Sequence, residues 1–464
     1  MYEEYDFIVV GAGVIGPALA KGMSDRGRKV LVLERDLNEP DRIVGELLQP
    51  GGLESLKKLG MEEAVEGIDA AVVEGYEVIY EGERVHIPYP EYSPDFDLAK
   101  TTQLGVPATG RGFHHGRFIM NLRKIAREQP NVTMLQATAV DVIKNEETGR
   151  VLGVEAMVNG EKKPFFGTMT LMCDGTASAF RKQFTYIKPV IQGYFVGMVL
   201  DDVDLLRPNH GHVVIGAGHK PILVYQTTPT EARILCDVPP PMPSASNGDL
   251  KRYIEENCLP RLPKQMQPAF RKGLDNKKLR SMPNQYLPAT VNKTPGLVLV
   301  GDAMNMRHPL TGGGMTVCYN DAVLLCEMLG PQSVNLVDEE QVAAIMKKFY
   351  QERKAKSAVV NVLSVALYKL FSAETRELKI LQNGCFGYFE KGGECVRGPV
   401  SLLSGLLPRP AVLFYHFFAV AFYSIYLNFI NKGIVGFPLA LLQVFTVLYT
   451  AIVVFVPFLV RELF

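Results

Sequence analysis

The fold is decided by residues 5–16, which read YDFIVVGAGVIG. The apolar residues up to Val10 predict a buried strand, and three glycines follow with the spacing of a phosphate-binding turn between a strand and a helix. In such a turn Gly11 makes the tight bend, Gly13 lets the backbone approach a pyrophosphate, and Gly16 lets the helix pack on the strand. The phosphates then lie on free N–H groups at the helix N-terminus.

A second apolar run, residues 29–33, ends at Glu34. An acidic residue at this position accepts hydrogen bonds from a ribose hydroxyl in dinucleotide-binding folds. The glycine pattern is weak evidence by itself, but two strands and an acidic residue in register predict a dinucleotide site. Because FAD and NAD both use this pattern, these residues leave the choice between them open.

Two downstream segments favour a flavin. Cys173-Asp174-Gly175 follows the strand-like residues 168–172, and residues 296–303 (GLVLVGDA) form another apolar run that ends in Asp302. The glycine-rich residues 312–315 come after it. Aspartate at a strand end can accept from ribitol hydroxyls, and a glycine-rich loop that opens a helix can place N–H groups against an isoalloxazine ring. Each feature alone fits a capped strand or a surface turn, but together and in this order they resemble the single-component FAD monooxygenase superfamily.

Composition excludes several classes of protein. The 464 residues include 49 basic and 49 acidic ones, and this balance argues against a nucleic-acid partner. A hydrophobic share of 47% argues against disorder. The seven dispersed cysteines predict reduced thiols in a cytosol-facing protein. His114 and His115 lack a third ligand at a workable spacing, so we predict no metal site.

Two long apolar runs stand near the end of the sequence. Residues 411–431 and 434–460 contain no Asp, Glu, Lys or Arg, and only Lys432-Gly433 separates them. Each run exceeds the roughly 18 apolar residues of a membrane segment. We predict a helical hairpin at 411–460 that spans a bilayer or dips into it. The alternative is a pair of fully buried helices in a soluble core.

Longer motifs make the resemblance more specific. They are similar to motifs of the squalene epoxidase (squalene monooxygenase) family, and the similarity covers nearly the whole chain from about residue 5. The motifs are residues 43–52 (IVGELLQPGG), 113–120 (FHHGRFIM), 279–283 (LRSMP), 305–317 (NMRHPLTGGGMTV), 368–373 (YKLFSA) and 392–396 (GGECV).

The resemblance implies an FAD-dependent monooxygenase of sterol biosynthesis. Such an enzyme inserts one atom of O2 into squalene through a flavin C4a-hydroperoxide and yields (3S)-2,3-oxidosqualene. Its electrons come from NADPH through a membrane-bound NADPH–cytochrome reductase; transient docking of NADPH itself is the alternative. The expected location is the cytosolic face of the endoplasmic reticulum membrane, with the lipid droplet as an alternative, where squalene can enter from lipid.

The resemblance also assigns FAD contacts. Arg42 and Arg117 are cations suited to pyrophosphate or ribityl oxygens, with a surface salt bridge as the alternative for each. Val140, on the strand-like residues 137–143, is expected to contact adenine. The complete expected set is Gly11, Gly13, Val14, Ile15, Gly16, Glu34, Arg35, Arg42, Arg117, Val140, Asp302, Gly312, Gly313, Gly314 and Met315.

Squalene has no polar atom, so its recognition must rest on shape and apolar area, at roughly 25 cal/mol per Å². Leu367 and Phe371 are four residues apart and share one helical face, which fits core packing as well as a pocket. The resemblance favours the pocket. Its expected lining is Leu223, Tyr225, Leu367, Phe371, Phe386 and Phe389, and Tyr76 is the catalytic candidate, expected to orient the region near the flavin.

The predicted fold is α/β (α+β), with a Rossmann-like FAD-binding domain, a β-rich substrate domain and C-terminal membrane-associated helices. The FAD-binding domain is expected to comprise 1–75, 108–180 and 275–330, the substrate domain 76–107 and 181–274, and the helical region 331–464. Two rival functions share this core. One is a geranylgeranyl-reductase-like flavoprotein that hydrogenates prenyl chains without consuming O2. The other is a non-catalytic, membrane-attached FAD-binding protein.

Overall fold

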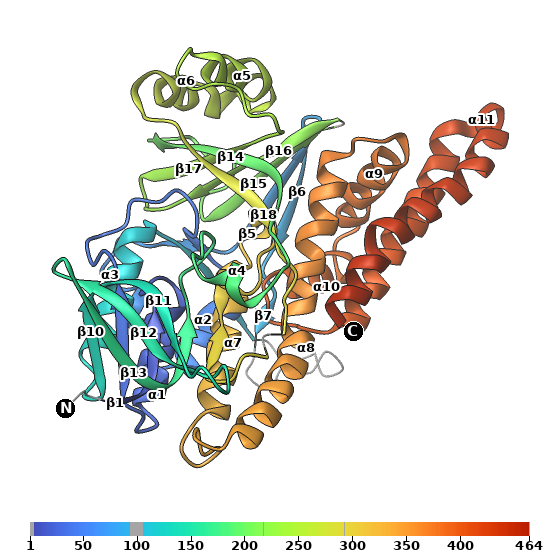
Figure 1. The fold of residues 1–464 in the computed structure, drawn as a ribbon. Coiled ribbons are helices and arrows are strands. Elements are labelled where there is room, and N and C mark those ends of the chain that lie inside the picture. Colours follow the sequence, from blue (N-terminus) through green and yellow to red (C-terminus); the bar gives the residue numbers. More distant parts are fainter. Residues whose placement is uncertain (1–3, 93–104, 217, 292, 464) are drawn as a thin grey trace.

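Two large sheets and a set of C-terminal helices make up the computed structural model (Figure 1). The structure describes residues 4–92, 105–216, 218–291 and 293–463. The part of the expected substrate segment 76–107 that falls at 93–104 lies outside these residues.

The first sheet carries the glycine motif. Its strands β10, β2, β1 and β13 are parallel neighbours, β19 continues parallel to the C-terminal half of β13, and β12 and β11 extend the sheet antiparallel from the N-terminal half. These strands are β1 (Glu4–Val10), β2 (Val30–Glu34), β10 (Val132–Gln136), β11 (Thr138–Lys144), β12 (Val151–Val158), β13 (Glu161–Met172) and β19 (Leu297–Leu299). The central strands are nearly continuous apolar runs because helices and strands cover them from both sides.

The second sheet has the order β18-β14-β17-β16-β15-β5-β6 and is antiparallel except for the β15–β5 pair. Its strands are β5 (Gly75–Tyr80), β6 (Glu83–Pro88), β14 (Val190–Asp201), β15 (His210–Gly216), β16 (His219–Gln226), β17 (Glu231–Val238) and β18 (Arg280–Tyr286). Strand β18 lies inside 275–330, which the sequence assigns to the FAD-binding domain, and pairs with β14. That segment therefore contributes a strand to the second sheet as well.

Helices and short strands connect the two sheets. Helices α5 and α6 pack on one face of the second sheet, with Leu250, Ile254 and Phe270 in the shared core. The connecting elements are α1 (Ile15–Ser24), β3 (Leu47–Leu48), α2 (Pro50–Lys58), η1 (Glu62–Val65), β4 (Ala71–Val73), β7 (Glu91–Tyr92), β8 (Val106–Pro107), β9 (Gly110–Gly112), α3 (His115–Arg127), α4 (Arg181–Phe184), α5 (Asp249–Asn257), η3 (Leu259–Arg261), η4 (Lys264–Met266), α6 (Gln267–Asn276), η5 (Gly301–Ala303), η6 (Pro309–Thr311) and α7 (Gly314–Met328).

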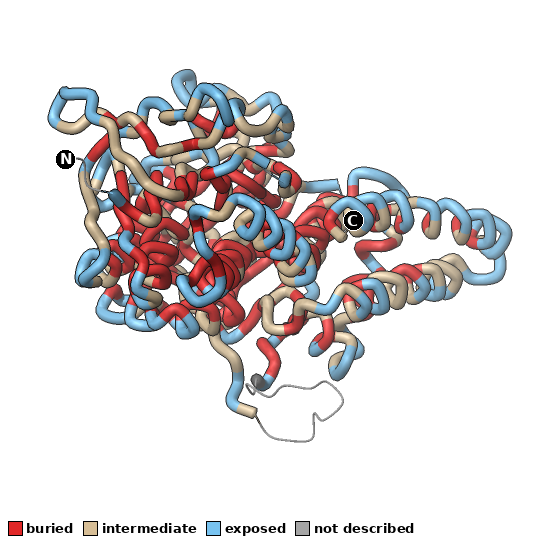
Figure 2. The backbone as a smooth tube through the Cα atoms, turned by 60° about the horizontal axis from the view of Figure 1, so that its bottom comes forward, coloured by how far each residue is buried: buried red, intermediate tan, exposed pale blue. Residues whose placement is uncertain are grey.

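Four helices follow α7: α8 (Glu339–Ser372), α9 (Arg376–Glu390), α10 (Glu394–Leu403) and α11 (Pro410–Leu463). Helix α11 is two helices that meet at Gly433, whose φ of 59° and ψ of −165° are not helical. The rings of Phe417 and Phe455 stack with centroids 4.1 Å apart, so the two arms lie side by side. This reversal forms the hairpin expected at 411–460, and Figure 2 shows its arms projecting from the body.

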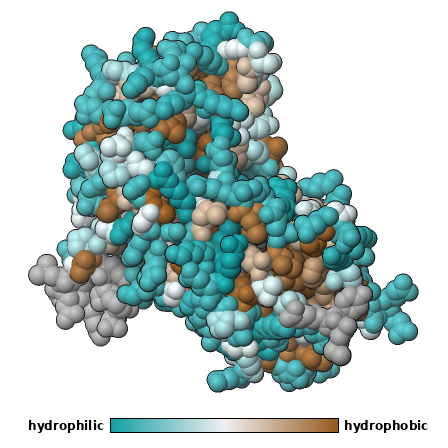
Figure 3. Space-filling model, turned by 90° about the vertical axis from the view of Figure 1, so that its left-hand side faces the viewer, coloured by the Kyte–Doolittle hydropathy of each residue, from teal (hydrophilic) through white to brown (hydrophobic). Residues whose placement is uncertain are grey.

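Much of the hairpin surface is apolar and exposed. In the described part of the chain α11 is long and apolar enough to cross a membrane, with a mean hydropathy of 2.4 over 18 residues of which 33% are buried. Helices α8 and α9 pass the same test only when taken together as a pair bent by 108°. A helix in a soluble core would be mostly buried, so this exposure argues against that alternative. The face of the molecule away from the hairpin is largely hydrophilic (Figure 3).

Candidate active site

The glycine turn between β1 and α1 leaves one side open. Gly11 has a φ of 105°, and a Cβ there would lie 2.6 Å from the carbonyl oxygen of Cys173. A Cβ at Gly16 would lie 1.9 Å from the carbonyl oxygen of Gly11, whereas a Cβ at Gly13 would meet nothing within 4 Å. Packing therefore requires glycine at the first and third positions, and the second position faces the space where a pyrophosphate would approach. Val14 and Ile15 begin the helix whose N–H groups face that space.

Glu34 ends β2 beside this turn. Its Oε2 accepts a hydrogen bond from the backbone N–H of Ala12 at 2.6 Å. The buried Arg123 of α3 donates from Nε to the carbonyl oxygen of Ala12 at 2.8 Å, and another of its nitrogens lies 3.8 Å from the Glu34 carboxylate. Arg123 is not among the site residues predicted from the sequence. Its one local signal is its position on the buried side of α3. This arginine fixes the turn and the acidic residue relative to each other.

The other expected cations lie at the surface. Arg117 pairs with Asp69 at 3.0 Å, as in the alternative of a surface salt bridge, and Arg35 and Arg42 are exposed. Val140 is 42% exposed on β11, at an irregularity in the pairing with β12. Contacts of these four residues with FAD stay predictions.

Asp302 lies in η5, directly after β19, and faces three arginines. Burial raises the pKa of its carboxyl, and Arg307, Arg181 and Arg42 act against that rise. The Arg181 guanidinium donates to the carbonyl oxygens of Gly175, Asp302 and Ala303 at 2.9, 2.9 and 2.8 Å. Arg181, which sequence reasoning also missed, thus joins the two aspartate-bearing turns at the carboxyl ends of β13 and β19.

The glycine-rich loop joins η6 to α7. Gly312 has a φ of 60°, and a Cβ at Gly313 would lie 2.3 Å from a side-chain carbon of Val360. A Cβ at Gly314 would meet only Arg307, at 3.9 Å, so the first turn of α7 is open on that side. Arg307 donates to the carbonyl oxygen of Gly314 at 3.2 Å, and Met315 is buried behind the loop.

These features fit a flavin dinucleotide. Asp174 Oδ1 and Arg307 Nε are buried and have no hydrogen-bond partner among the described residues, and both lie on segments that flank the open turns. Buried polar atoms normally have partners, so a ligand with hydroxyl and carbonyl groups would satisfy them. No group of three or more His, Cys, Asp or Glu side chains suited to a metal occurs among the residues that the structure describes.

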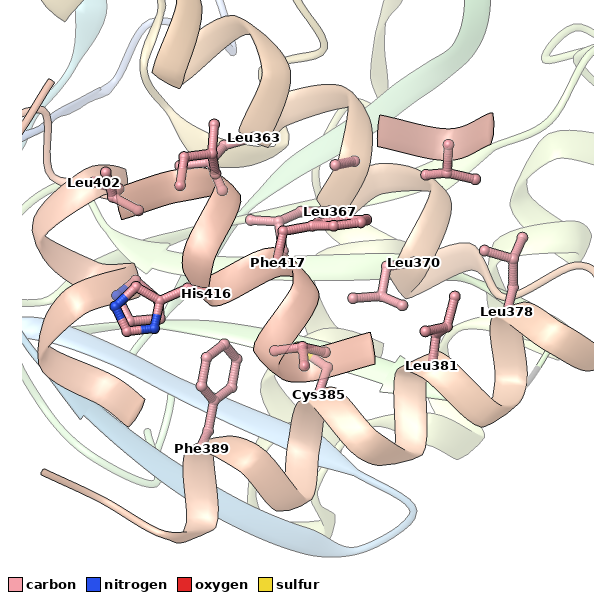
Figure 4. A pocket seen from close by; sticks show the side chains of 15 residues that line it. Leu363, Leu367, Leu370, Leu378, Leu381, Cys385, Phe389, Leu402, His416 and Phe417 are labelled. Carbon is pink, nitrogen blue, oxygen red and sulfur yellow. The ribbon is translucent and has the colours of Figure 1, made fainter. Parts of the chain in front are cut away.

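An apolar cavity begins next to the glycine-rich loop. It is lined by Tyr76, Leu310 and Thr311 at one end and by α8, α9 and α10 at the other. A second apolar cavity lies between α8, α9, α10 and α11 (Figure 4). Both are lined by Leu363, Leu367, Phe389 and Pro399. The two cavities therefore adjoin and lead from the loop to the hairpin.

The expected pocket residues divide into two groups. Leu367, Phe371 and Phe389 line the cavities. Leu223 is paired in register with the lining residue Val213, and Phe386 packs on Tyr80 with ring centroids 5.4 Å apart. The structure does not place these two side chains among the lining residues. Contacts of all these residues with a substrate stay predictions.

Tyr225 faces a buried ion pair instead of the cavity. Its hydroxyl donates to Glu46 Oε2 at 3.2 Å, and Arg233 donates to both oxygens of Glu46 at 2.8 Å. Burial and the Glu46 carboxylate hold the pKa of Tyr225 well above its usual value. Its apolar body and polar tip suit this buried cluster, and sequence alone does not reveal the Glu46 partner.

Tyr76 belongs to a buried hydrogen-bond network at the inner end of the cavity. Its hydroxyl accepts from Nε2 of Gln49, and the same nitrogen donates to the carbonyl oxygen of Thr311 at 2.8 Å. Tyr89 donates to Gln49 Oε1 at 2.6 Å. Burial raises the pKa of Tyr76, so its phenol stays protonated near neutral pH. Gln49 and Tyr89, which are not among the expected site residues, hold Tyr76 beside the loop.

Comparisons with solved structures identify the fold. The flavin-dependent brominase Bmp2 superposes with a TM-score of 0.68 at 14% identity, covering 91% of this chain and 99% of its own. The p-nitrophenol 4-monooxygenase PnpA from Pseudomonas putida also gives a TM-score of 0.68 at 16% identity, covering 88% of this chain and 99% of its own. The expected α/β fold of FAD-dependent monooxygenases is therefore confirmed, and FAD is the cofactor that this fold supports.

Comparisons of sequence identify the family. The squalene epoxidase family model matches residues 166–442. Squalene epoxidase ERG1 of Candida albicans is 45% identical over 99% of both chains, and squalene epoxidase erg1 of Aspergillus fumigatus is 46% identical over 100% of this chain and 95% of its own. Squalene monooxygenase SE1 of Panax ginseng is 43% identical over 90% of this chain and 76% of its own. The chain belongs to the squalene epoxidase family, and it is an oxidoreductase.

Proposed function

We propose that this protein epoxidises squalene in an FAD-dependent reaction. The balance is squalene + O2 + NADPH + H⁺ → 2,3-oxidosqualene + H2O + NADP⁺, with one oxygen atom added across a terminal double bond. One observation carries the proposal: the apolar cavities begin at Leu310 and Thr311, immediately before the glycine loop, and continue to the hairpin. An apolar chain can thus reach the loop without crossing water.

The FAD would lie across the carboxyl ends of the first sheet. The N–H groups at Val14 and Ile15 would bind its pyrophosphate next to Gly13, and Glu34 would accept from the ribose. Asp302 would accept from the ribityl hydroxyls, and residues 312–315 would face the ring. When bound, FAD supplies the activation of O2 that no amino-acid side chain provides.

The cavity would hold squalene by apolar contact alone. At about 25 cal/mol per Å², burial of a long hydrocarbon chain supplies several kcal/mol without any hydrogen bond. Leu367 and Phe389 line both cavities, so they would contact the middle of the chain and set its depth. The same apolar walls would exclude water from the reacting double bond. Exclusion of water would prevent side reactions during the oxidation.

Tyr76 would act by position and not as a proton source. Its hydroxyl lies between Gln49 and Tyr89, and Gln49 also holds the carbonyl of Thr311. The network fixes the wall of the cavity relative to the loop. A double bond that enters there is therefore presented to the ring in one orientation.

The hairpin would place the enzyme on a lipid bilayer, the source of squalene. Its exposed apolar residues include Ile434 and Val435 at 94% and 98% exposure near the turn, and Leu442 and Phe445 at 67% and 71% along the second arm. A contiguous exposed apolar surface marks a membrane or protein contact. We assign it to the cytosolic face of the endoplasmic reticulum membrane, with a membrane-bound NADPH–cytochrome reductase as electron donor.

Product analysis tests this function. Detergent-solubilised protein is incubated with FAD, squalene, NADPH and a reductase, and oxygen uptake is compared with 2,3-oxidosqualene formed. We expect one O2 consumed per epoxide in the coupled reaction. Hydrogenation of a prenyl chain without oxygen uptake would establish the reductase alternative, and FAD binding without any turnover would support the non-catalytic one.

A further inference from the structure

The hairpin ends in a buried carboxylate that bridges two other elements. Glu462, near the end of α11, is only 5% exposed. Its Oε1 accepts from the hydroxyl of Tyr286, at the end of β18, at 3.2 Å. Its Oε2 accepts from Nδ2 of Asn361, in the middle of α8, at 2.7 Å. The two carboxylate oxygens thus serve two donors from segments about 100 and 176 residues away.

Asn361 continues the network to the flavin loop. Its Nδ2 also donates to Asn305 Oδ1 at 3.1 Å, and Arg307 donates to the same oxygen at 2.8 Å. Arg307 in turn donates to the carbonyl oxygen of Gly314 at 3.2 Å. Asn305 is 1% exposed and is held by its own donation to the carbonyl of Leu287 at 2.8 Å. Every link from the hairpin end to the loop is a direct hydrogen bond.

We propose that Glu462 is a positioning residue that couples the seating of the membrane hairpin to the binding of FAD. The coupling rests on the proposed function in one respect, since it takes residues 312–315 as the flavin loop. With the hairpin end in place, the amide nitrogen of Asn361 points toward Asn305 and donates to its Oδ1. Asn305 in turn holds Arg307, which donates to the carbonyl oxygen of Gly314. An unseated hairpin end removes the acceptor that orients Asn361.

The network requires an acceptor for Asn361 at this position. In Glu462→Gln the amide oxygen can still accept from Asn361, and the NH2 group can donate to the Tyr286 hydroxyl oxygen, because a phenol both donates and accepts. In Glu462→Met neither Tyr286 nor Asn361 finds an acceptor in the side chain of residue 462. A buried donor left in this state costs about 1–3 kcal/mol.

Two substitutions of Glu462 test the coupling. In Glu462→Met, which removes the acceptor of Asn361, we expect the Kd for FAD to rise at least about fivefold. In Glu462→Gln, which keeps an acceptor oxygen for Asn361, the Kd should stay within about twofold. In Tyr286→Phe, Glu462 still accepts from Asn361, and the Kd should also stay within about twofold. Rescue by the conservative variant is an outcome that general destabilisation does not produce.

Hydrogen exchange supplies a readout that does not depend on the flavin. Without added FAD, Glu462→Met should raise amide exchange in residues 312–317, and Glu462→Gln should not. Val447→Ala is the matched control, because it removes packing from the buried hairpin core without touching the network. Unchanged exchange and unchanged FAD affinity in Glu462→Met would overturn the coupling, as would an equal effect of Val447→Ala.

The two proposals can fail separately. If Gly13→Val retains FAD while Glu462→Met alters exchange in the loop, the flavin assignment fails and the coupling between hairpin and loop holds. If Gly13→Val loses FAD while Glu462→Met changes neither readout, the flavin site holds and the coupling fails.

Discussion

Gln49 and Thr311, 262 residues apart in the chain, are joined by a buried hydrogen bond of 2.8 Å from the side-chain amide to the backbone carbonyl. The same amide nitrogen donates to the Tyr76 hydroxyl. One side chain therefore connects the wall of the apolar cavity to the residue before the glycine loop. In the proposed reaction Tyr76 would therefore act by holding this wall in place and not by transferring a proton.

Tyr76→Phe should lower kcat for squalene epoxidation by about two- to tenfold, since the change removes the acceptor of one buried hydrogen bond. FAD content should stay unchanged, because Gln49 still donates a hydrogen bond to the carbonyl oxygen of Thr311. Turnover and flavin absorbance on the same preparation check this. Burial raises the pKa of Tyr76, so the pH profile between 6 and 8 should keep its shape in the variant. A change of profile would assign Tyr76 a proton-transfer role.

Gly13→Val should weaken FAD binding by roughly two orders of magnitude without unfolding the protein. A Cβ at this position meets nothing within 4 Å, so the fold accepts it, but the added methyl groups occupy the approach of the pyrophosphate. Loss of hydrogen bonds to a charged group predicts about 3 kcal/mol, or roughly 150-fold in Kd. Flavin fluorescence titration measures the affinity and a thermal melt measures the fold.

The control for that variant is Gly216→Ala in the second sheet, where a Cβ meets only Arg261 at 3.9 Å. It should bind FAD like the parent protein. Yellow colour retained by Gly13→Val would refute the phosphate site.

The sequence predicts those parts of the site that local geometry determines. The glycine turn has the expected form because residues 11–16 contain both the strand end and the helix start. The reversal at Gly433 follows from two uncharged runs with a break between them. Both features depend on neighbours in the chain and are therefore readable from a short window.

Contacts between segments that are far apart in the chain could not be predicted from such short windows of sequence. Arg123 and Arg181 hold the turns together by donating to backbone carbonyls. Every residue has such a carbonyl, so the sequence does not show which one accepts. Helical spacing places Phe386 and Phe389 on one side of α9, yet Phe389 lines the cavity and Phe386 packs on Tyr80. Spacing gives the face of a helix but not the partner that each side chain on it meets.

His212 should make the protein less stable at acidic pH. Burial lowers the pKa of this side chain to about 4, below the unfolded value of about 6.5. Between these values the unfolded chain binds a proton that the folded chain does not, so stability is complete above pH 6.5 and falls as pH decreases toward 4. The contribution is about 1.4 kcal/mol per pH unit.

Urea denaturation of His212→Gln in detergent at pH 7 and pH 5.5 checks this contribution. Compared with the parent protein, the variant should lose less stability between the two pH values. The exposed His219→Gln is the control and should follow the parent. Identical pH dependence in all three proteins would contradict the prediction.

Charges on the exposed side of the hairpin should weaken membrane binding. Lysine at the centre of a membrane helix costs about 2.5–3.5 kcal/mol, so Leu442→Lys with Phe445→Lys should move most of the protein from the pelleted membrane to the supernatant. Val337→Lys, at a residue that is 73% exposed outside the hairpin, is the control. Deletion of 411–464 should also release the protein, and a protein that still pellets would need a second anchor.

Phe389→Ala should impair the use of squalene far more than the binding of FAD. The side chain lines both cavities, and its truncation removes roughly 1.5–3 kcal/mol of apolar burial, which predicts about a 10- to 100-fold rise in KM. Phe184→Ala is the matched control: Phe184 is also half-buried, but it packs on the core of the first sheet.

Initial rates over a range of squalene concentrations, normalised to bound flavin, separate the two effects. A rise in KM confined to Phe389→Ala places the substrate where the cavities adjoin. Equal losses of activity and flavin in both variants would move Phe389 to the structural core. The hydrocarbon would then have to reach the loop by another route, because Phe389 contributes to both cavities on the path from the hairpin.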